Sequence, residues 1–181
     1  EEAEKRGLLN LRSAPDAIPH LVADKNIELF CKHKVFTERE LRARYEILLE
    51  TYAKVLNIEA RTMVDMVYKD ILPAVSGYGK ELSDAIIGKK QAIGYVACYE
   101  TENLLALSRL TDSIYSVVKE LENAIAESKK NKDNFARAKS FELQVLPKMK
   151  ELRSEVDRAE RITSLKAWPY PTYADMLFGV R

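Results

Sequence analysis

Apolar residues recur every three or four positions along most of the chain, which is the period of an amphipathic helix. The first long run follows the motif TERE, in which Thr37 and Glu40 can form a capping box at a helix start. Its apolar stripe steps by four, three, four and three residues: Leu41, Tyr45, Leu48, Tyr52 and Val55. The pattern predicts a helix over about 38–75, bent near Pro73, because proline lacks an N–H donor and clashes with the preceding turn.

Glycines interrupt the pattern after this run. Four of the six glycines fall in SGYGKELSDAIIGKKQAIG (76–94), which predicts a turn, a short helix and a second break. Apolar residues at helical spacing then predict helices at about 91–130 and 133–163, the latter kinked at Pro147. The expected seams are Ile93, Val96, Leu107, Leu110, Ile114, Val117, Leu121 and Ile125 in the first, and Phe135, Ala138, Val145, Met149, Leu152, Val156 and Ala159 in the second. A shorter helix at about 22–34 could pack as the fourth helix of a bundle.

The fold class follows from these runs. No segment alternates with a period of two and β-branched enrichment, so we expect essentially no sheet. Long helices with short connections pack against each other in opposite directions. The sequence therefore predicts an all-α fold: an antiparallel bundle of three long helices plus shorter N- and C-terminal helices.

The C-terminal segment WPYPTYADMLFGVR differs from the rest. Pro169 and Pro171 are expected to hold it extended, and Thr172 to cap one last short helix with Asp175 nearby. Its aromatic and aliphatic residues make it strongly apolar. We therefore expect this tail to dock on another surface, most simply on the chain's own core.

Composition narrows the class of partner. Lys plus Arg (29) and Asp plus Glu (28) nearly cancel in a chain of 181 residues. No broad electrostatic field then favours nucleic acid, and no apolar run near twenty residues predicts a membrane span. Cys31 and Cys98 are far apart and belong to no Cys-x-x-Cys pair, which favours two free, buried thiols in a reducing compartment, the cytoplasm.

Motifs for independent chemistry are missing from the sequence. GYGK and GKKQ lack both the earlier glycine and the following Ser or Thr of a phosphate-binding loop. Cys31 and His33 diverge by roughly 200° on a helix, and neither His20 nor His33 follows a glutamate by three positions, as a di-iron bundle would require. Ser76 is in no Gly-x-Ser-x-Gly elbow. We expect no catalytic, cofactor-binding or metal residue in these 181 residues.

The stretch NIEARTMVDM (57–66) has the look of a polar site. On a helix, however, Arg61 and Asp65 are i,i+4 neighbours that can pair, and Ile58, Thr62 and Met66 form an inward stripe. Glu59 then sits at the margin of that stripe. Packing is the preferred interpretation, although Glu59 and Arg61 are where one would look if this helix reached the active site of a parent enzyme.

Three long segments carry a resemblance to a known family. EKRGLLNLRSAPDAI (4–18), RYEILLETYAKVLNIEARTMVDMVYKDILPA (44–74) and WPYPTYADMLF (168–178) resemble the C-terminal region of type III glutamine synthetase. The resemblance implies a whole enzyme that makes glutamine from glutamate and ammonia with ATP and Mg²⁺ or Mn²⁺. It also implies stacked hexameric rings with active sites between subunits. The family's metal-binding and nucleotide-binding motifs would lie upstream, so no catalytic residue is carried over.

The resemblance, with a start that lacks Met, implies a piece of a longer protein. We expect residues 1–20 to be the exit from an upstream catalytic domain, 21–165 a helical bundle domain, and 166–181 an aromatic, proline-rich docking tail. The expected function is an accessory domain that supports subunit packing, assembly or regulation, with the catalytic domain and neighbouring subunits of a homo-oligomer as partners. The alternative is an independent helical adaptor that docks an unrelated protein through its tail.

Overall fold

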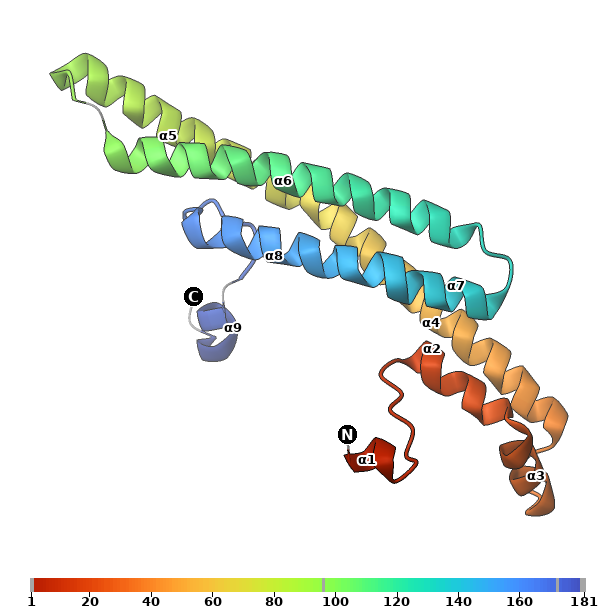
Figure 1. Ribbon diagram of the computed structural model, residues 1–181. Coiled ribbons are helices and arrows are strands. Elements are labelled where there is room, and N and C mark those ends of the chain that lie inside the picture. Colours follow the sequence, from red (N-terminus) through yellow and green to blue (C-terminus); the bar gives the residue numbers. More distant parts are fainter. Residues whose placement is uncertain (1, 96, 172, 180–181) are drawn as a thin grey trace. The chain divides into compact units, whose positions relative to one another are not determined.

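The computed structural model describes residues 2–95, 97–171 and 173–179, and these residues form helices and no strand (Figure 1). The elements, in chain order, are α1 (Glu2–Lys5), α2 (Ala14–Ala17), the 3-10 helix η1 (Ile18–Val22), α3 (Asp24–Lys32), α4 (Glu38–Met66), the π-helix η2 (Val67–Ile71), α5 (Leu72–Ile93), α6 (Cys98–Lys129), α7 (Asn134–Ser140), the π-helix η3 (Phe141–Val145), α8 (Leu146–Ile162) and α9 (Tyr173–Phe178). The expected all-α class, with three long helical runs and shorter helices at both ends, is confirmed.

The first long run begins where the sequence predicts. The Thr37 N–H donates to Glu40 Oε2 at 2.7 Å, and the Glu40 N–H donates to Thr37 Oγ1 at 3.3 Å. These two hydrogen bonds are the reciprocal pair of a capping box. The local motif thus satisfies backbone donors that the first turn of α4 leaves without helical partners.

The first run ends later than predicted. It continues from α4 through η2 and α5 to Ile93, so the break expected just after 75 is wrong. A glycine inside a helix costs about 1 kcal/mol relative to alanine, which packing of Val75 and Leu82 in the core can offset. The run ends at Gly94, which adopts a left-handed φ of 66° and donates its N–H to the Lys90 carbonyl. The next helix consequently begins at Cys98 rather than near 91.

Both helix-interior prolines follow a π turn. In η2 the Leu72 N–H donates to the Val67 carbonyl, and in η3 the Leu146 N–H donates to the Phe141 carbonyl. Each bond spans five residues instead of four, and each is followed directly by Pro73 or Pro147. Because proline cannot donate to the carbonyl four residues back and its ring clashes with it, a wider turn accommodates it. The two predicted points of distortion are therefore π turns.

The chain divides into two compact units, and the first comprises residues 1–60 and 123–147. Its core joins α4 to the end of α6 and to α7 and η3. The buried side chains include Leu41, Leu49, Ala53, Leu56, Ala60, Ile125, Ala138, Phe141 and Val145. The predicted stripe is wrong at Leu48 and Val55, which are each 46% exposed. The helix buries Leu49 and Leu56 instead, one position further along.

The second unit comprises residues 61–122 and 148–181. Within it α5 and α6 run side by side in opposite directions (Figure 1). Its buried side chains include Val67, Ile71, Val75, Leu82, Leu107, Leu110, Ile114, Val117, Leu121, Met149, Leu152 and Ala159. The seams predicted for the second and third long helices are confirmed at these positions. The exceptions are Ile93, exposed at the end of α5, and Phe135, which is 37% exposed in α7 of the first unit. Val156 is only half-buried, and Val96 lies outside the described residues.

The short helices expected near both ends are also present. The segment predicted at 22–34 contains α3, and α9 is the last short helix of the tail. Its expected cap, Thr172, lies outside the described residues. The N-terminal segment adds α2, where the Ser13 hydroxyl accepts from the Asp16 N–H as the N-cap.

Candidate functional site

The polar stretch 57–66 is not a cluster in the structure. Ile58 is 63% exposed and Thr62 is exposed as well, whereas Ala60 and Val64 are buried. The predicted inward stripe through Ile58 and Thr62 is therefore wrong. The reason is the same as at Leu48. The helix α4 has apolar residues on more than one side, and the neighbouring helices determine which side is buried.

The charged residues of this stretch also differ from the prediction. Asp65 pairs with Lys69 at 3.0 Å, in place of the expected partner Arg61. Glu59 and Arg61 are exposed on the surface of α4. An exposed i,i+4 ion pair stabilises a helix by only a few tenths of a kcal/mol. We therefore interpret these charges as the solvated surface of α4 and not as a binding site.

The His, Cys, Asp and Glu side chains also form no candidate metal or thiol site in the described residues. Within the described residues, no group of three or more His, Cys, Asp or Glu side chains is placed to hold a metal ion. Cys31 and Cys98 are not joined in a disulfide, and both are exposed, so their predicted burial is wrong. His33 is exposed too, at the end of α3. Among the described helices none is long and apolar enough to cross a membrane.

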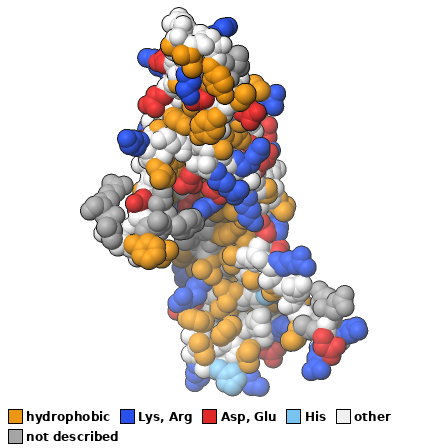
Figure 2. Space-filling model, turned by 90° about the vertical axis from the view of Figure 1, so that its left-hand side faces the viewer, with side chains coloured by type: hydrophobic (Ala, Val, Ile, Leu, Met, Phe, Trp, Pro, Cys, Tyr) orange, Lys and Arg blue, Asp and Glu red, His pale blue; other side chains and the backbone are white. Residues whose placement is uncertain are grey.

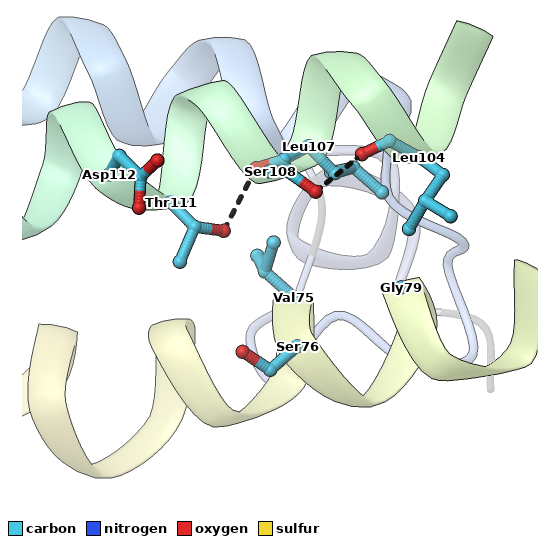
Figure 3. A pocket seen from close by; sticks show the side chains of 8 residues that line it. All are labelled: Val75, Ser76, Gly79, Leu104, Leu107, Ser108, Thr111 and Asp112. Carbon is cyan, nitrogen blue, oxygen red and sulfur yellow. Dashed lines mark hydrogen bonds between the residues drawn. The ribbon is translucent and has the colours of Figure 1, made fainter. Parts of the chain in front are cut away.

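A groove of about 320 Å³ lies between α5 and α6 in the second unit (Figure 3). It is lined by Val75, Ser76, Gly79, Leu104, Leu107, Ser108, Thr111 and Asp112. The hydroxyls of Ser108 and Thr111 donate to the carbonyls of Leu104 and Leu107, both at 2.8 Å. Asp112 is the one titratable side chain in this lining, and both hydroxyls donate to backbone carbonyls rather than to its carboxylate, so neither is paired with a base that would activate it. The groove reflects small side chains at a helix–helix contact.

The tail makes a polar contact at the π turn η2. The Tyr170 hydroxyl donates to Asp70 Oδ2 at 2.7 Å, across 100 residues of sequence. Burial of the ring, and then the hydrogen bond to the carboxylate, raise the pKa of Tyr170 to about 12. The phenol is therefore neutral and a donor over the whole physiological range. This contact, the tail anchor, fixes the extended segment before α9 to the first long helical run.

The same π turn holds α6 through a second cluster. The Tyr68 hydroxyl donates to Glu122 Oε2 at 3.1 Å, and Lys119 Nζ lies 3.1 Å from the same oxygen. The Lys119 ammonium also lies 5.4 Å from the ring centroid of Tyr68 and 5.7 Å from that of Tyr115. The hydrogen bond with Tyr68, and then the one with Glu122, raise the pKa of Lys119. The lysine stays charged and links two aromatic rings and a carboxylate.

A matching arrangement exists in the first unit beside η3. Lys139 Nζ lies 2.7 Å from Asp16 Oδ1 and 2.7 Å from Glu142 Oε2, so one ammonium joins α2 to the π turn. Lys139, followed by the Ser13 hydroxyl, lowers the pKa of Asp16. Thus each π turn anchors a segment from one end of the chain.

Sequence reasoning missed these anchors because no local pattern marks them. Asp16 and Lys139 are 123 residues apart, and Asp70 and Tyr170 are 100 residues apart. The one available signal was the Leu-Pro pair after each π turn, at Pro73 and Pro147, since a proline inside a helix requires a local rearrangement of backbone bonding.

Several apolar side chains reach the surface between charged ones (Figure 2). Three groups of them lie on or beside the helices, and others, such as Leu8, Leu9 and Leu11, lie elsewhere along the described chain. The exposed groups are Met176, Leu177 and Phe178 in α9; Ile93, Tyr95 and Tyr99 around the turn between α5 and α6; and Ile47, Leu48, Val55 and Ile58 along α4. Contiguous exposed apolar residues are typical of surfaces that contact other protein.

These features define a class of protein. The described chain is helical, held by packed seams and long-range anchors, and offers apolar surface rather than a constellation of reactive groups. That is the character of an accessory or interaction domain.

Comparison with known proteins identifies the family. The profile of the Glutamine synthetase C-terminal domain family matches residues 1–90. The whole chain is 39% identical to a glutamine synthetase from Butyrivibrio fibrisolvens, of which it spans 26%. It is 32% identical over 98% of its length to a type-3 glutamine synthetase from Dictyostelium discoideum, and 26% identical over 98% of its length to a glutamine synthetase from Bacteroides fragilis, in each case spanning 25% of the relative. The chain belongs to the glutamine synthetase C-terminal domain family and resembles the type III form in particular.

Proposed function

We propose that the chain is the C-terminal accessory domain of an enzyme that makes glutamine from glutamate, ammonia and ATP, and that it supports packing and assembly of the subunits. The observation that carries this proposal is the coverage of the match. The entire chain aligns with glutamine synthetase, yet it spans only about a quarter of each relative. The three exposed apolar groups described above supply surface for contacts with the remaining three quarters.

The reaction's ATP and Mg²⁺ or Mn²⁺ belong, in this proposal, to the remainder of the enzyme. A magnesium or manganese site requires several oxygen ligands that converge on one point. The described residues contain no such group of carboxylates and histidines. The fit of these helices to a metal–nucleotide site is therefore poor, and no step of the reaction is assigned to them.

The proposed organisation keeps three parts. Residues 1–20 lead from the catalytic domain, 21–165 form the bundle, and 166–181 form the tail that returns to η2 through Tyr170. The proposed partners are the upstream catalytic domain and neighbouring subunits, in an oligomer of stacked hexameric rings as the family resemblance implies. A cytoplasmic location fits the exposed thiol of Cys31, because reducing compartments keep exposed cysteines out of disulfides.

Removing residues 21–181 from the whole enzyme tests the proposal. We expect the truncated protein to form smaller particles and to unfold at a lower temperature, because the surfaces that bridge its parts are gone. Light scattering coupled to size-exclusion chromatography measures the first effect, and a thermal melt the second. If particle mass, melting temperature and turnover all equal those of the whole enzyme, the proposal is wrong.

The adaptor alternative rests on the exposed apolar face of α9. Its residues Met176, Leu177 and Phe178 remain at the surface although the preceding segment is anchored. A whole enzyme lacking 166–181 separates the two functions. Loss of a stoichiometric partner unrelated to the synthetase, with assembly unchanged, favours the adaptor; a change in assembly with no such partner favours the accessory domain.

A further inference from the structure

The helix α4 has two apolar sides, and only one is covered by the described chain. Leu49, Leu56 and Ala60 are buried in the first unit. About a third of a turn or more away around the helix lie the other apolar residues, which we call the outer face of α4 and define as Ile47, Leu48, Val55 and Ile58 with Thr51 between them. Ile47 is 59% exposed and Ile58 63%, and Thr51 is exposed as well.

The spacing of this face is that of a helix-packing seam. Leu48 and Val55 are seven residues apart, as are Thr51 and Ile58. A repeat of this kind places the side chains in one strip along a helix, over about 17 Å from Ile47 to Ile58. A helix that is apolar on two sides is typically enclosed on both. The outer face is therefore built to be covered.

Charge does not select the partner of this face. The Arg44 guanidinium already lies over the Phe36 ring, 4.4 Å from its centroid, and Lys54 pairs with Glu50 at 2.7 Å. The cations at the margins of the outer face are thus engaged within the unit. A partner therefore contacts the apolar side chains of the outer face, and we expect the centre of the partner's surface to be apolar and uncharged.

A second copy of the face is too small a partner. Full burial of one aliphatic side chain removes about 60–120 Å² from water, so two copies of these half-exposed residues would bury roughly 400 Å². Stable interfaces between separate molecules bury about 1,200 Å² or more. A strip of this size is sufficient only for a partner that is tethered to it, because tethering raises the effective concentration to about the millimolar range. The relatives are about four times as long as this chain, so such a tethered partner exists in the same polypeptide.

We propose that the outer face of α4 is covered in the whole enzyme by an apolar surface of the polypeptide upstream of residue 1. This inference rests on the proposed function and names the surface through which the accessory domain meets the enzyme. It also explains why the sequence pattern of α4 pointed to Leu48 and Val55 as inward residues: they are inward in the complete protein, toward a partner outside this chain.

Photo-crosslinking in the whole enzyme tests the proposal. A benzophenone amino acid replaces Thr51, at the centre of the outer face, and in a matched control it replaces Arg39, an exposed residue on the same helix about a third of a turn away. After irradiation, mass spectrometry identifies the linked peptides. We expect links from position 51 to peptides upstream of residue 1, and far fewer from position 39. Links from position 51 that lead to residues 1–181 of another copy, or a yield no greater than at position 39, overturn the proposal.

A second variant keeps the test independent of cross-linker placement. Val55→Lys introduces a charge into the outer face while keeping a good helix former, and Ala43→Lys is the matched change at an exposed position outside it. We expect the upstream link from position 51 to fall by about ten-fold in Val55→Lys, the effect of losing roughly one well-buried aliphatic contact. In Ala43→Lys it stays unchanged. An equal effect of both variants, or of neither, contradicts the proposal.

The outcome is distinguishable from failure of the proposed function. If deletion of residues 21–181 disturbs assembly but position 51 links elsewhere, the accessory role stands and the assignment of this face is wrong. If deletion leaves the enzyme unchanged, the accessory role itself fails, whatever position 51 contacts.

Discussion

Single side chains connect the ends of this chain to its long helices. Tyr170 reaches Asp70 in η2, and Lys139 joins Asp16 to Glu142 in η3. Both contacts use a carboxylate within a π turn, Asp70 in η2 and Glu142 in η3. These anchors are the residue-scale reason that terminal segments with little regular structure lie on the helices.

The tail anchor makes a prediction for Tyr170→Phe. The variant keeps the ring but loses a hydrogen bond to a carboxylate, which contributes about 1–3 kcal/mol. We expect faster amide hydrogen exchange in residues 164–171 of the whole enzyme and unchanged exchange in α6. Tyr115→Phe is the matched control, because that ring contacts Lys119 mainly through its face. Equal exchange in Tyr170→Phe and the parent enzyme would show that the anchor contributes nothing.

The pH dependence of the tail anchor has a definite sign. The pKa of Tyr170 is raised from 10.0 to about 12, so the folded state holds the phenolic proton more tightly than the unfolded state. The stabilisation is fully present below pH 10 and is lost as the pH rises from about 10 through 12. Exchange in residues 164–171, corrected for the intrinsic rate, should rise over this window in the parent and remain flat in Tyr170→Phe. A flat profile in the parent contradicts the account.

The helices show which kinds of sequence signal specify an element. The capping box of Thr37 and Glu40, the end signal at Gly94 and the disturbance at Pro73 are local, and the structure contains all three at those positions. The covered side of α4 is not local information. Leu48 and Leu49 are equally apolar neighbours, and only the packing partners decide that Leu49 is buried. The break predicted at the internal glycines is wrong for the same reason. The packing of α5 outweighs the free-energy cost of glycine inside a helix.

Gly88 inside α5 and Gly94 just after its end give opposite predictions for substitution by alanine. Gly94→Ala places a Cβ on a residue with φ of 66°, which costs about 1–2 kcal/mol although no atom lies within 4 Å of that Cβ. Gly88→Ala also meets open space but in helical backbone, where alanine gains up to about 1 kcal/mol. Hydrogen exchange of residues 84–99 should quicken in the first variant and slow in the second. The same direction of change in both would refute the assigned end of α5.

At the scale of the whole molecule, the 181 residues span about a quarter of the length of the relatives they match. Their charges nearly balance, with 29 basic and 28 acidic residues. Many of the charged side chains form ion pairs with each other along the helix surfaces. What remains for recognition is apolar: the outer face of α4, the turn after α5 and the face of α9. Surfaces of this kind connect a domain to protein rather than to substrate, and they fit a part that holds an enzyme together.

The most direct test of this account is glutamine formation per assembled particle in the enzyme that lacks residues 21–181. Particle mass and turnover are measured together over a series of protein concentrations. If these helices support assembly and contribute nothing to the reaction, the truncated enzyme falls apart at dilutions that the whole enzyme survives. At high concentration each reassembled particle then turns over at the rate of the whole enzyme. Fully assembled truncated particles with no turnover would contradict the account, because the helices would then supply a group that the chemistry needs.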